Sequence, residues 1–377
     1  MSATPAAPPR VLLDVAGHAP VPATVRDAYL AALDEGWADP RRLHSEGRRA
    51  RALVDGAREA IAALVGARTE EVDLAPSHTA ALHSAVLTVA RGRRRVGDRI
   101  VASAVERMAV LDAADHAGSR LTVAVDGDGR LDVEAFTGAV QSPGVALAAV
   151  QHANGEVGTR QPVAQAHELA REAGVPLLVD GGSSFGHAPI GPEWDLLTLD
   201  AADVGAPPGV AVLVTRSGVR RSPTGPVAEH ERWFPGGVSV PTALASAVAL
   251  QLAARRVPDP EPVARMRQRI AAEVPMTMVA GPADPAARLP HVLTFSCLYV
   301  DGEAIVTALD QAGFAVASGS ACTSATETPS HVLAAMGSLT QGNVRLTLPP
   351  EVDPAQIERF CDVVPGVVAD IRARNGL

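Results

Sequence analysis

The sequence contains no lysine: all 33 residues that are lysine or arginine are arginine. A Schiff base needs a primary amine that can lose its proton, and arginine's guanidinium cannot do this at working pH. A genome rich in G and C favours arginine over lysine, and selection against lysine modification is an alternative explanation. In either case no side chain of this protein can hold an aldehyde as a Schiff base, and the N-terminal amine is the one remaining candidate.

Cysteines and long apolar runs are also scarce. The three cysteines form no C-x-x-C pair, which argues against a disulfide framework or a zinc ribbon, and we predict no metal site. No stretch of about 18 apolar residues suggests a membrane span, and the first residues lack the layout of a signal peptide. A net charge of -9 argues against general nucleic-acid binding. We expect a cytoplasmic protein that binds neither membrane nor nucleic acid.

Short apolar runs alternate with helical patterns over the first two thirds of the chain. This alternation predicts an α/β fold whose mostly parallel sheet is covered by helices on both faces. Its ligand should lie beyond the carboxyl ends of the strands. Ser45 is the expected cap of a long helix that runs to residue 65. The predicted strands are 99–104, 121–125, 145–150, 175–179, 196–199 and 210–214, and the other predicted helices include 22–33, 79–89, 133–140 and 163–173.

The pattern changes near residue 252, and 377 residues are enough for a large and a small domain. We predict an N-terminal segment (1–20) that joins the small domain, a large domain (21–255) and a small α+β domain (256–377). The small domain's predicted elements are helices 260–272, 302–312 and 354–374 and strands 276–280 and 291–299.

One cysteine, Cys322, lies in a segment of small polar residues between an expected strand (314–317) and an expected helix (331–336). Such a loop packs little and can carry a reactive thiol. A buried, inert thiol is the commoner fate of a lone cysteine, and it suits Cys297 and Cys361 in their apolar surroundings. Cys322 is therefore the candidate nucleophile.

The run from Ser318 to Thr323, followed by Pro329-Ser330-His331-Val332-Leu333, resembles the active-site loop of cysteine desulfurases. These are class-V aminotransferase-fold enzymes that use pyridoxal phosphate (PLP, fold type I), and the resemblance extends with gaps over nearly the whole chain. It implies that PLP activates free cysteine and that the loop cysteine takes its sulfur as a persulfide. It also implies a homodimer, and it makes Arg345 the group that binds the substrate carboxylate.

Part of the cofactor pocket resembles the family's. The run from His152 to Gly158 is similar to the family's His-x-Asn-x-Glu-x-Gly turn, which implies that Asn154 lies beside the cofactor. Asp180 matches the aspartate that keeps the pyridine nitrogen protonated. Thr79 matches a residue of the phosphate-binding turn, although taken alone it is more often a plain helix cap.

Several positions depart from the family pattern, and four of them lie in the cofactor pocket at candidate site residues. Arg107 replaces the histidine that stacks on the ring, and Ser183 replaces a glutamine. Asp200 replaces a phosphate-binding serine, and Asp203 stands where the family has its Schiff-base lysine. A carboxylate about 4 Å from a phosphate dianion is unfavourable by roughly 1 kcal/mol even in water. We therefore expect no cofactor, and we expect Arg107 and Asp203 to pair across the pocket.

These features favour a desulfurase-like protein that has lost PLP-dependent catalysis. Cys322 would then accept or relay sulfur, or the chain would be the non-catalytic partner of an active cysteine desulfurase or a sulfur-carrier protein. A second hypothesis is an enzyme of PLP-independent chemistry that uses the rewritten pocket. A third is a conventional desulfurase acting on L-cysteine, and a fourth is a scaffold in which Cys322 is a relic. The candidate catalytic residues are Cys322, Arg345, His152 and Asp203.

Overall fold

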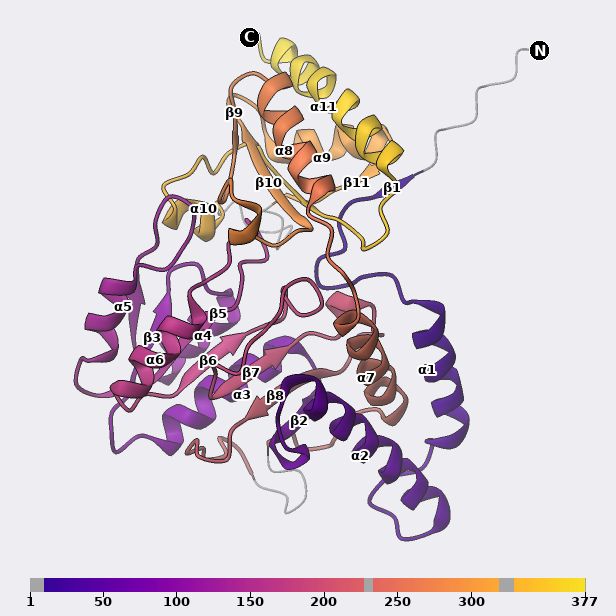
Figure 1. Ribbon diagram of the computed structural model, residues 1–377, viewed down its shortest axis with the longest axis vertical. Helices are drawn as coiled ribbons and strands as arrows, with labels where there is room; N and C mark the ends of the chain where they lie inside the picture. The colour runs from indigo at the N-terminus through magenta and orange to yellow at the C-terminus, as the bar shows by residue number, and fades with distance from the viewer. Residues whose placement is uncertain (1–9, 227–232, 319–328, 377) are drawn as a thin grey trace.

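The computed structural model describes residues 10–226, 233–318 and 329–376. Its centre is a seven-stranded sheet with the strand order β2-β8-β7-β6-β5-β3-β4 (Figure 1). The strands from β4 to β7 are parallel, whereas β8 and β2 are antiparallel to their neighbours, so the predicted mostly parallel sheet is confirmed. The strands are β2 (Val72–Ala75), β3 (Arg99–Ser103), β4 (Ser119–Val123), β5 (Val145–Gln151), β6 (Leu177–Asp180), β7 (Leu196–Leu199) and β8 (Ala211–Thr215).

The central strands are continuous apolar runs of sequence, which favours burial on both faces of the sheet. Every residue of β5, β6, β7 and β8 is buried, as expected for strands that are covered on both faces. The edge strand β4 is mostly exposed or half-buried. Because four of the strands run parallel to β3, their carboxyl ends meet at one edge of the sheet, above which the small domain lies in Figure 1.

Helices cover both faces of the sheet. On one face, α3 (His78–Gly92) and α4 (Met108–Ala117) share a core with inward residues such as Ile100 and Leu147. On the other face, the core includes Val101 and Val150. That second core receives residues from α1 (Ala23–Glu35), α2 (Ser45–Val65), α5 (Val133–Val140), α6 (Val163–Glu172) and α7 (Val240–Ala254).

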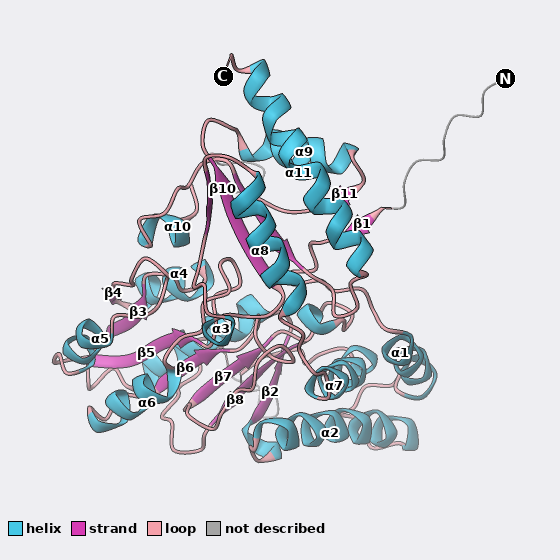
Figure 2. Cartoon of the chain, turned by 45° about the horizontal axis from the view of Figure 1, so that its top comes forward, coloured by secondary structure: helices cyan, strands magenta, loops and turns pink. Residues whose placement is uncertain are grey.

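A further core, formed by residues of the N-terminal segment and of the last third of the chain, lies above the sheet in Figures 1 and 2. Its antiparallel sheet has the order β12-β10-β9, and a two-stranded sheet joins β1 (Val11–Leu12) to β11 (Phe314–Ala315). The N-terminal strand thus pairs with a strand of the last third of the chain, while the exact domain boundaries stay predictions. The other elements are α8 (Glu261–Glu273), β9 (Thr277–Val279), β10 (Val292–Cys297), α9 (Gly302–Gln311), α10 (His331–Ala335), β12 (Asn343–Thr347) and α11 (Pro354–Arg374).

Two helix starts differ from prediction. Ser45 is the first residue of α2, and the cap is His44, whose Nδ1 accepts the backbone N–H of Gly47 at 3.2 Å. An imidazole nitrogen without a proton can accept in the same way as a serine oxygen. Likewise Ser77, and not Thr79, caps α3 by accepting from Ala80 N at 3.1 Å.

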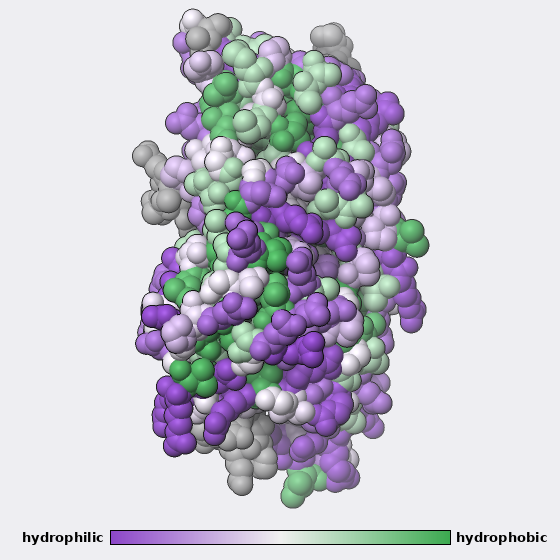
Figure 3. Space-filling model, turned by 60° about the vertical axis from the view of Figure 1, so that its left-hand side comes forward, coloured by the Kyte–Doolittle hydropathy of each residue, from purple (hydrophilic) through white to green (hydrophobic). Residues whose placement is uncertain are grey.

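None of the helices in the described ranges is long and apolar enough to cross a membrane. On the face shown in Figure 3, hydrophilic and hydrophobic residues are interspersed.

Candidate functional site

Four of the predicted pocket residues lie at or shortly after the carboxyl ends of the parallel strands β3, β6 and β7. Arg107 comes shortly after β3 and directly precedes α4. Asp180 is the last residue of β6, Asp200 follows β7 directly, and Asp203 lies on a short 3-10 turn, Ala202–Val204. The topology therefore brings together residues that are far apart in the sequence.

Asp180 is the centre of this cluster. Its Oδ2 accepts from Arg107 Nε at 2.7 Å. Its Oδ1 lies 3.0 Å from His78 Nε2 and accepts from Thr198 Oγ1 at 3.3 Å and from Gly182 N at 2.8 Å. Burial alone would raise the pKa of Asp180, but the charges of His78 and Arg107 and these hydrogen bonds hold it well below its usual range. Asp180 is therefore a carboxylate with both oxygens engaged.

The guanidinium of Arg107 also donates from Nη2 to Ser183 Oγ at 2.5 Å. The predicted pairing of Arg107 with Asp203 is thus replaced by an ion pair with Asp180. Burial lowers the pKa of Arg107, and the surrounding negative charges raise it by more. Asp203 is one of these charges and forms no hydrogen bond with Arg107 in the described structure. The physical reason is that Asp180, at the end of β6, offers an oxygen within hydrogen-bond distance of Nε.

Asp203 is a buried carboxyl group that accepts the backbone N–H of Gly17 at 2.7 Å through Oδ1. Burial raises its pKa to about 6, the neighbouring charge of Asp200 adds to the rise, and the Gly17 hydrogen bond opposes it. Asp200 is less buried. Its Oδ1 accepts from Ala202 N at 3.1 Å, and its Oδ2 lies 4.0 Å from His78 Nδ1.

The side chain of Asn154 holds its own turn. Its Oδ1 accepts from Glu156 N at 2.8 Å and from Val157 N at 2.9 Å, and its Nδ2 donates to Val105 O at 3.1 Å. His152, two residues earlier, is buried, and burial lowers the pKa of its imidazole to about 4. Its Nδ1 has no hydrogen-bond partner among the described residues. His152 is therefore a neutral imidazole at pH 7.

Cys322 lies outside the described residues, but both flanks of its segment are described. On one side Ala317 pairs with Arg345 of β12 through backbone hydrogen bonds of 2.7 and 3.0 Å. On the other side, the ring of His331 makes a 2.8 Å hydrogen bond from Nε2 to the backbone oxygen of Glu106. Glu106 directly precedes Arg107, so the chain on either side of Cys322 is fixed at Arg345 and at the pocket.

Arg345 faces two carboxylates. Its Nη2 lies 3.7 Å from Asp14 Oδ1, and its Nε has no hydrogen-bond partner within the described part of the chain. Burial raises the pKa of Glu156, while a hydrogen bond from Ser330 and the charge of Arg345 oppose that rise. Arg345 therefore keeps a buried donor for a further acceptor, such as a carboxylate.

Three residues of the site were not predicted as such. His78 bonds Asp180, although the sequence shows it only as part of a helix start. Glu156 was visible within the His152 turn. Glu106 accepts from Gln151 N at 2.6 Å, and burial, together with the charge of Asp180, raises its pKa to about 8. Glu106 matches the glutamate of the family's Glu-His pair, but the sequence does not predict that this acid is buried. Thr79, in contrast, is exposed on α3, and Ser77 performs the capping.

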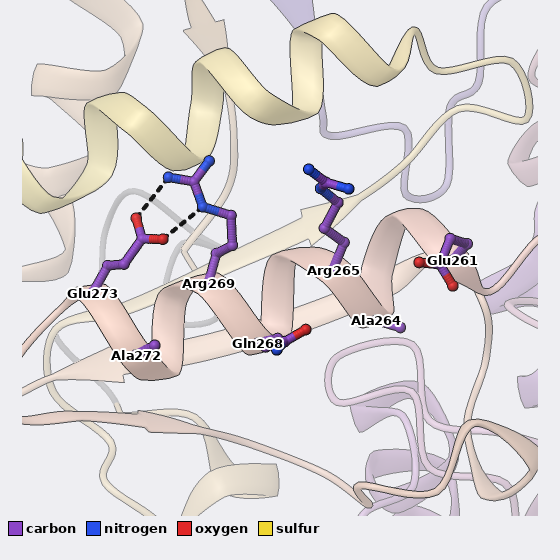
Figure 4. A pocket seen from close by; sticks show the side chains of 7 residues that line it. All are labelled: Glu261, Ala264, Arg265, Gln268, Arg269, Ala272 and Glu273. Carbon is purple, nitrogen blue, oxygen red and sulfur yellow. Dashed lines mark hydrogen bonds and ion pairs between the residues drawn. The ribbon is translucent and has the colours of Figure 1, made fainter.

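A surface cavity along α8 lies apart from these residues (Figure 4). Its walls come from α8 itself, where Arg269 donates to both carboxylate oxygens of Glu273 at 2.7 Å. Because Arg269 already pairs with Glu273, and Arg265 with Glu358, this cavity is not the candidate site.

The chain is similar to known proteins over nearly its whole length. The family model described as Aminotransferase class-V matches residues 11–231 and 244–360. A cysteine desulfurase of Cereibacter sphaeroides is 36% identical over 389 residues, with 97% of each chain covered. An IscS-like cysteine desulfurase of Mycobacterium tuberculosis is 33% identical with 96% of each covered. A solved NifS-like protein shares the fold, with a TM-score of 0.87 at 21% identity over 96% of this chain and 99% of that one.

These matches contradict the prediction that no cofactor is expected. Class-V aminotransferases and cysteine desulfurases work with PLP, and no finding shows that this chain has lost it. PLP is therefore the cofactor that the similarity implies, and the prediction of none was wrong. Its error was to treat the absence of a lysine anchor as the absence of binding.

The described side chains nevertheless do not fit PLP in the way that the resemblance implies. A pyridine nitrogen would need an oxygen of Asp180, but Arg107 already occupies Oδ2 at 2.7 Å. Asp200 brings a negative charge to the position of a phosphate ligand, and the chain has no lysine for the aldehyde. We therefore derive no chemical step through PLP.

Proposed function

Because this chain belongs to the cysteine desulfurase family, we propose that it serves sulfur transfer through Cys322 and does not perform the lysine-dependent release of sulfur from L-cysteine. The proposal concerns the catalytic step and not the binding of PLP. The chain would be a sulfur acceptor or relay, or the non-catalytic partner of an active enzyme.

The observation that carries the proposal is a contrast between two parts of the site. Arg345 and His331 hold the two flanks of the Cys322 segment through backbone or side-chain hydrogen bonds. In the pocket, by contrast, Arg107 occupies the carboxylate of Asp180, and Asp203 stands at the lysine position. The residues beside the Cys322 segment match the family, whereas several cofactor-contacting positions, the Schiff-base lysine among them, are changed.

The transfer step needs no oxidant. The Cys322 thiolate attacks the terminal sulfur of a persulfide donor, so that a new S–S bond forms on Cys322 while the donor's S–S bond breaks. The donor leaves as a thiolate with the electron pair of the broken bond. A carboxylate on the donor, such as that of a cysteine residue at a chain end, would suit the unpartnered Nε of Arg345.

We also propose a homodimer in the cytoplasm, with an active cysteine desulfurase or a sulfur-carrier protein as a further partner. The proposal of a partner follows from the transfer step, because that step needs a persulfide donor and an active desulfurase or a sulfur-carrier protein would supply one.

Intact-protein mass spectrometry tests the proposal. Wild type is incubated with L-cysteine and a separate active desulfurase, and we expect a reducible gain of one sulfur atom that Cys322→Ser abolishes. Cys297→Ser and Cys361→Ser are matched controls, because both thiols are buried and burial raises the pKa of each. Both controls should keep the gain.

The same experiment separates the other hypotheses. A gain with L-cysteine and PLP alone, without the second enzyme, would show a conventional desulfurase and overturn the proposal. No gain in any mixture would leave a structural partner or an enzyme that uses the rewritten pocket. A mass gain that persists in Cys322→Ser would show that a residue other than Cys322 carries the sulfur.

A further inference from the structure

A buried cluster lies where three distant segments meet. His187 belongs to the connection between β6 and β7, Asp203 to the turn after β7, and His291 directly precedes β10. All three are buried, with exposed fractions of 9%, 7% and 7%. One ligand atom from each side chain lies within 4.8 Å of the others.

The two histidine rings are stacked face to face. Their centroids are 3.5 Å apart, and their planes are inclined by 17°. The Nδ1 atom of His291 is buried and has no hydrogen-bond partner in the described part of the chain. A buried polar atom without a partner costs roughly 1–3 kcal/mol, so a ligand at this atom would recover a loss that the fold otherwise bears.

The donor set of the cluster suits a cation. Two imidazoles and one carboxylate are ligands typical of zinc and its neighbours, and three protein ligands leave a fourth position for water.

We propose that His187, Asp203 and His291 bind a divalent transition-metal ion of the zinc type. Such an ion would tie His291, which begins a strand of the upper sheet, to two segments that follow strands of the central sheet. It would also give a role to the carboxylate that stands at the family's lysine position.

Positive charges oppose the ion: Arg107 and His78 act on Asp203, and Arg256 acts on the whole cluster. The positive charge of Arg256 acts on both histidines and on Asp203, and its Nη2 donates to Val204 O at 3.3 Å. Asp203 itself, Asp200 beside it and Glu351 near Arg256 supply negative charge that offsets the guanidinium. We therefore expect that removing the charge of Arg256 tightens metal binding, which a merely structural role of the cluster would not do.

The test uses tag-free, full-length protein in a Cys322→Ser background, so that the loop thiol cannot contribute a ligand. The protein is equilibrated with Zn²⁺ or Co²⁺ and desalted. Elemental mass spectrometry then gives the number of metal ions retained per chain. The visible absorption spectrum of bound Co²⁺ reports which types of ligand hold the ion. We expect one ion per chain and a rise in the unfolding temperature with added metal.

The variants decide where the ion lies. His187→Phe keeps a ring in the stack, and Asp203→Asn keeps an acceptor for Gly17; each should weaken binding at least about tenfold, the smallest loss usual even for groups behind the metal ligands. Arg256→Gln should strengthen binding, whereas His116→Gln, an exposed histidine on α4, should not change it. Circular dichroism checks that each variant folds. Equal metal retention by wild type and both ligand variants, or none by wild type and Arg256→Gln, overturns the proposal.

Discussion

At the scale of single residues, ligand binding in the pocket depends on which donor forms a hydrogen bond with the carboxylate of Asp180. A charged hydrogen bond such as that from Arg107 Nε, 2.7 Å long, is worth about 1.5–3 kcal/mol. A ligand that needs the same oxygen must first break it. Restoring a lysine at position 203 alone should therefore give poor PLP binding, because the acceptor for the pyridine nitrogen stays occupied.

The double variant Arg107→His/Asp203→Lys should bind PLP at least about tenfold more tightly than Asp203→Lys, which corresponds to the hydrogen bond removed. Borohydride reduction followed by peptide mass spectrometry should find the cofactor fixed to the new lysine in the double variant. Wild type is the control, since it has no lysine to label. Equal labelling of the single and double variants would show that Arg107 does not obstruct the site.

The acid at position 203 also predicts a pH dependence of stability. Its pKa is raised from 3.8 to about 6 in the folded chain, so the folded state holds this proton more tightly than the unfolded state. The buried carboxyl group therefore costs nothing below about pH 3.8 and increasingly destabilises the fold as the pH rises to 6. At higher pH the cost is constant, at about 3 kcal/mol at most.

Asp203→Asn keeps an oxygen for Gly17 N and removes this cost. Its free energy of unfolding, measured by urea titration with a chelator present, should exceed that of wild type by about 1–3 kcal/mol at pH 8. The difference should shrink towards pH 4, where wild type is protonated as well. A difference that is constant with pH would mean that ionisation of Asp203 is not the cause.

At the scale of elements, the apolar runs were enough to predict the sheet, because its central strands are buried along their whole length. The strand β2 was not predicted, since Asp73 interrupts its four residues. Helix α7 was not predicted either, because its alanine-rich sequence is apolar around most of its circumference and shows little periodicity. Motif register was enough to place Asp180 and Asp203 in one region, but no register could predict that Arg107 bonds Asp180.

Helix α2 offers a prediction on packing, because two of its glycines have opposite surroundings. A Cβ at Gly47 would lie 2.5 Å from Arg42 O and 2.9 Å from Asp39 O, whereas a Cβ at Gly56 would meet nothing within 4 Å. Gly47→Ala should lower the free energy of unfolding by about 1–3 kcal/mol through overpacking. Gly56→Ala should raise it by about 0.5–1 kcal/mol, since a mid-helix glycine is replaced without a clash. Urea titration measures both, and equal effects would contradict the close approach of Gly47 to the chain at Asp39 and Arg42.

At the scale of the whole molecule, the site joins segments around the seven-stranded sheet to segments around β10 and β12. The flank of the Cys322 segment at Ala317 is paired to β12, while His331 binds the backbone of Glu106 beside the central sheet. The cluster of His187, Asp203 and His291 likewise combines residues from both. No single stretch of sequence could predict that cluster, because its two histidines lie in no motif and meet only through the fold.

We expect the interface of the proposed homodimer on the surface formed by α1 and by the connection between α1 and α2. Leu30, Leu33, Trp37 and Leu43 are 51%, 44%, 70% and 87% exposed in the single chain. Neighbouring exposed apolar side chains of this size are typical of a surface that a protein covers, and a second copy is the partner that the family implies. Trp37→Glu/Leu43→Glu should therefore convert the dimer to a monomer in size-exclusion chromatography with light scattering. Val257→Glu is the matched control, because Val257 is 92% exposed and lies between α7 and α8. A dimer that survives the double substitution would place the interface elsewhere, and a wild-type monomer would remove the homodimer altogether.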